Sequence, residues 1–361
     1  MRNADCGLRM ERRALLWVLA SSACLSAGLC GEPAALDAPA QVRQVETELK
    51  GAIAKATPAF VFIGGGAGVC ISADGYVLTS HHVVCRHGCW TVRVCGTGRM
   101  YLADVVGADP TGDVALLKIR NARDLPWLPF ADVTKARAGQ WVLALGDPYK
   151  LGDTDGPPSV SLGRLSALHR YQGDPKEPPA AFYADALQTD AAVNPGSSGG
   201  PLVNLEGELL GLTGQIMSRF GGKANSGIAY AVPADQLARF VPLLRAAQGG
   251  AVHHGTLPAG MELQWEAPAD GATAAGAVVH SVAAESAAAQ ASFQAGDRIV
   301  RVQGQEIGGP YRLFGSVQGW PAGAELEFEL WRGNALVKVR AVLAKLETDP
   351  NLAAQAPGSS R

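Results

Sequence analysis

A serine within a glycine-rich run is the residue whose surroundings best suit chemistry. Ser198 lies in the run 194–202, which has the sequence NPGSSGGPL. Glycines allow a tight turn and a close approach to a substrate, so the backbone N–H groups of Gly196, Ser197 and Ser198 could form an oxyanion hole, with those of Gly196 and Ser198 as its main donors. A run of this kind is more often a plain loop. Because apolar segments flank this one on both sides, we interpret Ser198 as a nucleophile.

A serine hydroxyl needs a base, and the sequence offers a histidine pair before two valines. His82 is the expected base, because imidazole titrates near neutral pH. His81 is expected to point away from the site, since neighbours at the end of a strand face opposite sides. The base in turn needs an orienting carboxylate. Asp113 stands directly before the apolar run 114–119, whereas Asp109 fits the preceding turn, so the predicted triad is His82, Asp113 and Ser198.

Four of the seven cysteines lie in one short region around the candidate base. Cys70, Cys85, Cys89 and Cys95 allow three connectivities, and in an oxidising compartment at least one disulfide is expected among them. We interpret it as a brace for the loop after His82. The alternative is a metal site built from the crowded side chains of His81, His82, Cys85, His87 and Cys89. That spacing matches no standard zinc pattern, so no metal is expected, and the chain carries no phosphate-binding motif that would indicate a nucleotide or flavin cofactor.

The first thirty residues predict export. A mostly positive front precedes the uncharged and largely apolar stretch 14–29, which is shorter than the roughly 20 residues of a confident membrane span. We expect residues 1–30 to be a signal peptide that is cleaved after Gly28 or Cys30. An uncleaved N-terminal anchor, or a lipoprotein at Cys24 or Cys30, is the alternative. The expected location is therefore the periplasm or the cell envelope.

The composition indicates a globular chain with more than one domain. The 361 residues exceed an ordinary single domain. With 47% hydrophobic and 18% charged residues, the chain does not resemble a disordered protein. The formal net charge of -2 and the lack of a long basic run give nucleic-acid binding no electrostatic support.

Short apolar runs separated by Gly, Asp and Pro predict a barrel or sandwich of β-strands. The runs are 60–63, 68–71, 76–78, 90–94, 114–119, 141–145, 202–204, 209–212 and 228–232. The sequence Ser72-Ala73-Asp74-Gly75 predicts a hairpin turn, and apolar residues at helical spacing predict a helix after Pro233. The expected organisation is a tether at 31–48, a first domain at 49–247, a linker at 248–259, a second domain at 260–347 and a disordered tail at 348–361.

Three separated motifs, in this order, resemble the HtrA/Deg family of trypsin-like serine proteases. They are TSHHVV at 79–84, DPTGDVALL at 109–117 and QTDAAVNPGSSGGPL at 188–202, and the likeness covers roughly residues 58–244. The resemblance implies a mainly β fold, with a trypsin-like double β-barrel and the site in the cleft between the barrels. It implies an endopeptidase that cleaves unfolded or damaged proteins through an acyl-enzyme, without a cofactor, as a homotrimer. A departure from the family is His81, where Asn is usual.

A chaperone-like or scaffold protein with little proteolysis is the rival hypothesis, although the intact triad argues against an inactive scaffold. The resemblance places the walls of the substrate pocket on Leu212, Gly214, Gln215, Ile216 and Ile228. These residues are mostly apolar and suit small aliphatic side chains, although the family often has an aliphatic residue at the position of Gln215. A pocket for Lys or Arg is not expected, because Ala192 stands six residues before the serine and Asp190 belongs to the structural motif.

The second domain resembles a PDZ domain. A predicted strand at 275–282, a small-residue helix at 286–291 and the core motif GDRIVRVQG at 296–304 carry the resemblance, and residues 323–333 fit the closing strands. PDZ domains add a peptide C-terminus to a sheet edge and hold its carboxylate with backbone N–H groups. The resemblance places this loop on Gly260, Met261, Glu262 and Leu263. Because Glu262 and Leu263 replace a usual glycine, a role in packing or regulation is as well supported as peptide capture.

Overall fold

The computed structural model describes residues 40–86, 88–152, 156–172, 183–216, 226–266 and 276–347. The predicted signal peptide, the first part of the tether and the predicted tail lie outside the described residues. The chain divides into two compact units, Met1–Thr47 and Glu48–Arg361. The predicted boundary between tether and first domain falls inside a helix, α2 (Ala40–Ala56), which the sequence analysis did not predict. Within the described part of the chain, we find no helix that combines the length and the apolar character needed to span a membrane.

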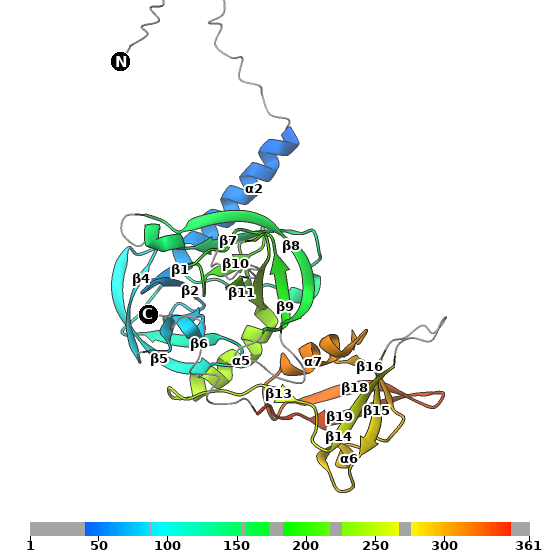
Figure 1. Cartoon of the computed structure of the whole chain (residues 1–361). Coiled ribbons are helices and arrows are strands. Elements are labelled where there is room, and N and C mark those ends of the chain that lie inside the picture. The colour runs from blue at the N-terminus through cyan, green and yellow to red at the C-terminus, as the bar shows by residue number, and fades with distance from the viewer. Residues whose placement is uncertain are drawn as a thin grey trace, which may run out of the picture. The chain divides into compact units, whose positions relative to one another are not determined.

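The first six strands close into a barrel in the order β1-β2-β3-β6-β5-β4 (Figure 1). Their bounds are β1 (Phe60–Ile63), β2 (Gly66–Cys70), β3 (Tyr76–Thr79), β4 (Cys89–Val94), β5 (Arg99–Asp109) and β6 (Val114–Ile119). A short helical segment, η1 (Thr57–Ala59), leads into β1, and the helical turn α3 (His81–Val84) follows β3. All four residues of β1 are buried, which explains why an uninterrupted apolar run predicted this strand.

The next six strands form a second closed barrel in the order β10-β11-β12-β9-β8-β7, drawn in green tones in Figure 1. They are β7 (Trp141–Gly146), β8 (Ser159–Gln172), β9 (Tyr183–Thr189), β10 (Pro201–Val203), β11 (Leu209–Ile216) and β12 (Ala229–Pro233). The short turns η2 (Val133–Lys135) and η3 (Pro148–Lys150) flank β7, and the predicted helix after Pro233 is α5 (Ala234–Ala246). The predicted double β-barrel is confirmed.

The hairpin between β2 and β3 illustrates how local sequence sets the barrel register. The N–H of Gly75 donates to the carbonyl of Ser72 at 3.0 Å, and Gly75 has a φ of +94°, which favours glycine. Val69 then pairs with Leu78 across the two strands, and both side chains are fully buried. The predicted turn at 72–75 is therefore confirmed.

A third sheet follows, in the order β14-β15-β16-β18-β19, and it forms the second domain. Its strands are β14 (Met261–Glu266), β15 (Gly276–Val282), β16 (Arg298–Val302), β18 (Glu325–Arg332) and β19 (Ala335–Val342), with β17 (Gln305–Glu306) paired to β16. The helices are α6 (Ala287–Gln290), which begins after the capping hydroxyl of Ser286, and α7 (Pro310–Gln318), which the sequence analysis did not predict. A separate apolar cluster, with Ile299 and Phe328 among its buried members, forms the core of this domain.

The segment predicted as a linker at 248–259 is partly built into the fold. Within it, β13 (Gly255–Thr256) pairs with β20 (Ala344–Lys345), and the side chain of His254 is completely buried. The linker assignment stays a prediction, and the contacts of this segment are with residues far away in the chain.

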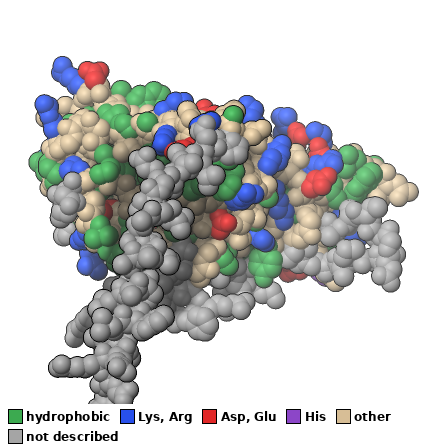
Figure 2. All heavy atoms as spheres, turned by 90° about the horizontal axis from the view of Figure 1, so that it is seen from above, with side chains coloured by type: hydrophobic (Ala, Val, Ile, Leu, Met, Phe, Trp, Pro, Cys, Tyr) green, Lys and Arg blue, Asp and Glu red, His purple; other side chains and the backbone are tan. Residues whose placement is uncertain are grey.

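The surface agrees with the near-neutral charge of the sequence. On the face shown in Figure 2, basic and acidic side chains lie interspersed with apolar and other polar groups. Many of the charges pair across strands, as Lys338 does with Glu327 at 2.6 Å on β19 and β18.

Candidate active site

His82 and Asp113 form the central pair of the predicted triad. His82 Nδ1 lies 2.9 Å from Asp113 Oδ1 and 2.8 Å from Oδ2, and the backbone N–H of His82 donates to Oδ1 at 3.0 Å. The carboxylate therefore fixes both the backbone and the ring of the histidine. The His82 side chain is 40% exposed and that of Asp113 only 7%, so the ring stays accessible while its partner is shielded from water.

The two histidines lie on the helical turn α3. Their predicted position at the end of a strand was wrong. The chain leaves β3 at Thr79, and Ser80 provides the extended residue before the turn. The N–H of His81 donates to the backbone carbonyl of Asp113 at 3.1 Å, which ties the turn to the residue that orients the base. His81 is half-buried. Burial lowers the pKa of its imidazole by more than the negative charges of Asp113 and Asp109 raise it. The imidazole of His81 is therefore neutral near pH 7.

Asp113 stands directly before β6, as predicted, in a turn that Asp109 organises. Oδ1 of Asp109 accepts a hydrogen bond from the N–H of Gly112 at 2.8 Å, and Asp113 follows with a φ of +56°. Burial alone would raise the pKa of Asp113. Its hydrogen bonds with His82, the charge of His82 and a hydrogen bond from Tyr183 outweigh burial, so the pKa lies below the usual value.

Tyr183 is a residue of this site that the sequence analysis missed. Its hydroxyl donates to Asp113 Oδ2 at 2.9 Å from the first residue of β9, and its side chain is buried. Burial and the neighbouring charge of Asp113 raise the pKa of Tyr183 well above the usual value, so the phenol keeps its proton. Gly214 makes room for it, because a Cβ at this position would overlap the hydroxyl. A tyrosine in an apolar run carries no mark of this role, since the role depends on two segments meeting in space.

Ser198 is held next to the strand end that leads to His82. Its backbone carbonyl accepts from the N–H of Ala67 at 2.8 Å, and its Oγ donates to the carbonyl of Gly214 at 3.3 Å. The following residue, Gly199, has a φ of +85°, and a Cβ there would lie only 2.7 Å from the backbone nitrogen of Ser80. Glycine at 199 thus permits the close contact between the serine loop and the segment before α3.

The turn before Ser198 carries the backbone N–H groups that are predicted to bind an oxyanion. The carbonyl of Pro195 accepts from the N–H of Tyr149 at 3.0 Å, so in the planar trans peptide the N–H of Gly196 points the opposite way. Gly196 has a φ of +100°, which requires glycine in practice. The N–H of Ser197 donates to Asn194 within the turn at 2.9 Å. The described backbone hydrogen bonds use neither the N–H of Gly196 nor that of Ser198, so these two groups stay the predicted donors for an oxyanion.

The residues predicted for the substrate pocket divide into different environments. Leu212 is 1% exposed and packs in the apolar core, so its side chain does not line an open pocket. Gly214 lies against Tyr183 and Ser198, and Ile228, just before β12, is 36% exposed. The backbones of Gln215 and Ile216 belong to β11, and their side chains lie outside the described residues.

Asp190, the acidic residue before the serine motif, has a structural role. Oδ1 of Asp190 accepts a hydrogen bond from the backbone N–H of Arg164 at 2.6 Å and thereby joins the segment after β9 to β8. Ala192 is exposed and brings no charge. Neither residue supplies a buried acid for a basic substrate side chain.

The four cysteines of the first barrel are free thiols in the structure. Cys85 and Cys89 are exposed, Cys95 is half-buried, and burial raises the pKa of Cys70 to about 12. The disulfide stays a prediction. His87, one member of the alternative metal cluster, lies outside the described residues, and the rest of the described chain contains no group of three or more His, Cys, Asp or Glu side chains that could hold a metal ion.

The predicted carboxylate loop of the second domain is mostly strand. Met261, Glu262 and Leu263 open β14 and pair with β15, with a bulge between Glu262 and Leu263, and their role in holding a carboxylate stays a prediction. Gly260, which precedes them, has a φ of +86° and packs closely on Ser286. β14 begins directly after this turn. Because β14 is the last strand on its side of the sheet, its outer edge has no strand partner in the described sheet.

Comparisons with known proteins agree with both domains. Residues 66–212 match a trypsin-like peptidase domain and residues 255–343 match a PDZ domain. The chain is 38% identical over 282 residues to the periplasmic serine endoprotease DegP of Escherichia coli strain K12, covering 77% of this chain and 56% of that protein. It is also 38% identical over 292 residues to a probable periplasmic serine protease do/HhoA-like of Haemophilus influenzae, covering 80% and 59%.

A solved structure shows the same likeness in three dimensions. The HtrA-type protease AlgW with tripeptide aligns with a TM-score of 0.62 at 29% identity, covering 83% of this chain and 98% of that chain. The chain spans little more than half the length of the curated relatives, between 54% and 59% for those above and a Brucella suis DegP-like protein. The order of a trypsin-like double barrel and a PDZ domain, together with these similarities, shows that the chain belongs to the HtrA/Deg family of trypsin-like serine proteases.

Proposed function

We propose that the chain is an exported serine endopeptidase that cleaves unfolded or damaged proteins. The observation that carries this proposal is the His82–Asp113 pair, with its two contacts of 2.9 and 2.8 Å, together with the close approach of the Ser198 loop to the segment before the histidine turn. The named relatives are a periplasmic serine endoprotease and a probable periplasmic serine protease, which supports the same activity and location for this chain.

In the proposed reaction, Oγ of Ser198 attacks the scissile carbonyl carbon while His82 accepts the hydroxyl proton. The N–H groups of Gly196 and Ser198 donate to the negative oxygen of the tetrahedral intermediate. His82 then gives its proton to the leaving amine as the C–N bond breaks, and an acyl-enzyme remains. Water attacks this ester with His82 again as the base, and the free serine returns. Asp113 keeps its charge throughout and stabilises the imidazolium.

The pocket and the assembly belong to the same proposal. Gly214, Ile228 and the β11 backbone at 215–216 are the proposed pocket walls. Because Gly214 and Ile228 bring no polar side chain, these walls favour small aliphatic side chains. The family resemblance favours a homotrimer, with regulation by the PDZ domain. The proposed location is the periplasm or the cell envelope. The N-terminal segment is either a cleaved signal peptide or an anchor that holds the chain at the membrane.

The central experiment compares the full chain with Ser198→Ala on unfolded casein. We expect the unmodified chain to cleave casein and the variant to be inactive, whereas Ser166→Ala on the exposed face of β8 should cleave normally. A fluorophosphonate should label the active protein at Ser198 alone. An active preparation labelled at another serine, or not labelled, would contradict the assignment. A folded chain that binds casein without cleaving it would favour a chaperone-like protein.

A further inference from the structure

The side chain of His254 is enclosed between the two domains of Glu48–Arg361, and it has no role in the mechanism above. Its side chain is 0% exposed and that of its partner Asp109 is 1% exposed. The adjacent residues of β13 pair with β20, which fixes the backbone on the side of the second domain. The carbonyl of His254 also accepts from the N–H of Leu346 at 2.9 Å. A histidine so completely enclosed must satisfy its ring nitrogens within the protein.

Both ring nitrogens of His254 face acceptors. Nε2 lies 2.7 Å from Oδ2 of Asp109, and Nδ1 makes a short hydrogen bond with the backbone carbonyl of Gln318. A carbonyl oxygen can only accept, so Nδ1 must carry a proton, and an ionised carboxylate requires a second proton on Nε2. The geometry therefore fits an imidazolium. Burial alone would lower the pKa of His254, but the charge of Asp109 and hydrogen bonds to Asp109 and Gln318 raise it above the usual value.

The Asp109 side of this contact reaches the catalytic turn. While Oδ2 of Asp109 binds His254, its Oδ1 accepts from the N–H of Gly112 at 2.8 Å. Gly112 precedes Asp113, and a Cβ on Gly112 would lie 2.7 Å from His254 Nε2. The imidazole thus packs directly against the turn that sets the position of Asp113.

The Gln318 side reaches the second domain. Gln318 is the last residue of α7, where backbone carbonyls lack partners within the helix and a positive charge is favourable. The ring of Phe240 on α5 covers the imidazole, with ring centroids 4.5 Å apart.

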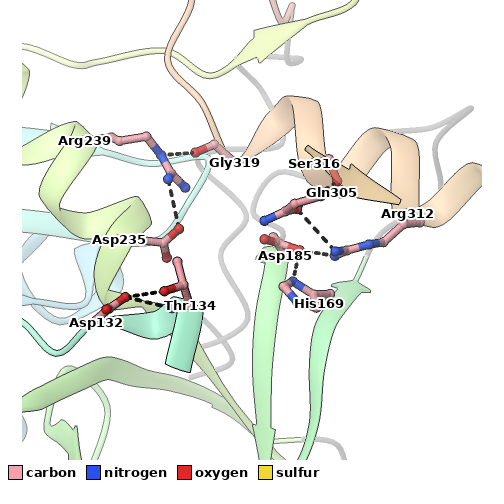
Figure 3. A network of polar contacts seen from close by, with 10 residues as sticks. All are labelled: Asp132, Thr134, His169, Asp185, Asp235, Arg239, Gln305, Arg312, Ser316 and Gly319. Atoms are coloured by element: carbon pink, nitrogen blue, oxygen red, sulfur yellow. Dashed lines mark hydrogen bonds and ion pairs between the residues drawn. The ribbon is translucent and has the colours of Figure 1, made fainter. Parts of the chain in front are cut away.

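Charged side chains on the adjoining elements bind other groups, as Arg239 does with Asp235 of the same helix at 2.9 Å. Arg239 of α5 donates to the carbonyl of Gly319 at 3.2 Å, beside the end of α7 (Figure 3). The charge of Asp109 raises the pKa of His81, but burial lowers it further, so His81 is neutral. Farther along α7, Arg312 donates to Asp185 of β9 at 2.7 Å, so the helix is anchored to the second barrel as well (Figure 3).

We propose that His254 is a positioning residue, whose imidazolium ties the end of α7 in the PDZ domain to the turn that places Asp113. The arrangement of the PDZ domain thereby supports the geometry of the triad. As a contribution to catalysis, this inference rests on the proposed protease function. The structural link from His254 to His82 through Asp109 and Asp113 does not depend on that function.

The test uses the full chain with His254→Gln, and His253→Gln as the matched control, because His253 is the exposed neighbour. A glutamine amide is uncharged and has only one donor nitrogen, so it cannot place a donor at both positions that Nδ1 and Nε2 occupy. With a short fluorogenic peptide, we expect His254→Gln to lower kcat about tenfold with KM within about twofold, and His253→Gln to match the unmodified chain. A folded His254→Gln variant with an unchanged kcat would overturn the catalytic part of the proposal.

A second measurement does not depend on activity or on folding of a variant. In ¹⁵N-histidine NMR spectra of the unmodified chain at pH 7, we expect His254 to carry protons on both ring nitrogens. Raising the pH through its pKa should shift the signal of the His82 Nδ1 proton, which is bound to Asp113. A neutral His254 at pH 7 would overturn the proposal. So would a His82 signal that does not change as His254 titrates. Absence of serine labelling with this NMR coupling intact would reject the protease function alone.

Discussion

The hydroxyl of Tyr183 donates a hydrogen bond to Oδ2 of Asp113 at 2.9 Å, from the start of β9 in the second barrel to the first. Together with the backbone N–H and the ring of His82, it places three donors around one buried carboxylate. Hydrogen bonds to a charged acceptor are stronger than neutral ones, and this carboxylate is largely shielded from water. The second barrel therefore contributes to the orientation of a base that belongs to the first barrel.

Tyr183→Phe should slow catalysis while it preserves the fold. The ring still fills its place, but Asp113 loses one donor, and we expect kcat to fall roughly tenfold. The lost hydrogen bond should also raise the pKa of Asp113 from its depressed value. The ionised form would then appear only at higher pH, and the acid limb of the kcat/KM profile should move upward in pH.

The pH profile is measured with a peptide substrate, and Tyr101→Phe on β5 is the control, since its hydroxyl contacts only Thr97 at 3.3 Å among the described hydrogen bonds. The same shift has a consequence for stability. Because folding lowers the pKa of Asp113, its stabilising contribution is present above the pKa of the unfolded chain and is lost as the pH falls through the folded value. If Tyr183→Phe left both the pH profile of kcat/KM and the midpoint pH of acid unfolding unchanged, Tyr183 would not control the pKa of Asp113.

His82 and His81 should differ sharply in their effect on activity. His82 holds the contacts with Asp113, so His82→Ala should reduce kcat by roughly 10⁴-fold or more. The ring nitrogen Nδ1 of His81 is buried without a hydrogen-bond partner in the described structure, and His81→Asn should keep most of the activity. Casein cleavage by the two variants is the measurement. If His81→Asn were inactive and His82→Ala active, the base would have been assigned to the wrong imidazole.

The elements that the sequence predicted are those whose cause is local. The run 60–63 is apolar because both faces of β1 are buried, and the turn at 72–75 carries its own hydrogen bond. The triad residues stood out because their motifs are specific in combination. In contrast, β5 mixes exposed and buried residues over its length, and α7 contains a glycine and begins with a proline, so neither has a clean period.

Tyr183 and His254 could not have been predicted by such reasoning. Each has its role through a partner far along the chain, Asp113 for the tyrosine and Asp109 for the histidine. A lone tyrosine or histidine in a sequence is more often a core or surface residue than a member of a site. The histidine turn was assigned to a strand for a related reason, since the hydrogen bond from His81 to the Asp113 backbone, and not the local sequence, holds it.

The cysteine prediction can now be made more specific. Cys70 is fully buried with a pKa of about 12, which keeps it as an unreactive thiol, whereas Cys85 and Cys89 are exposed on either side of one short loop. In protein purified from an oxidising compartment, we expect a linked peptide that contains Cys85 and Cys89. Mass spectrometry of protein alkylated without reduction is the measurement, and a reduced sample is the control. Four alkylated thiols, or a stoichiometric metal, would reject the disulfide.

The last prediction concerns Glu262 at the unpaired edge of the PDZ sheet. Its carboxylate is exposed and accepts a hydrogen bond from the hydroxyl of Ser281 at 2.8 Å, which holds the negative charge at the beginning of β14. A peptide C-terminus that added to this edge would bring a second carboxylate toward it. Repulsion between like charges should weaken that binding, by a modest factor because the site is exposed to solvent.

The test titrates the full chain carrying Ser198→Ala, which cannot cleave the ligand, with peptides that end in aliphatic residues. We expect weak binding, a severalfold gain in affinity with Glu262→Gln, and a smaller gain at high salt because ions screen the repulsion. The amidated peptide, which lacks the terminal charge, should bind both proteins alike. Tight binding by the chain that retains Glu262, lost on amidation of the peptide, would contradict the prediction. It would show that the backbone before β14 holds a carboxylate well despite the acidic side chain.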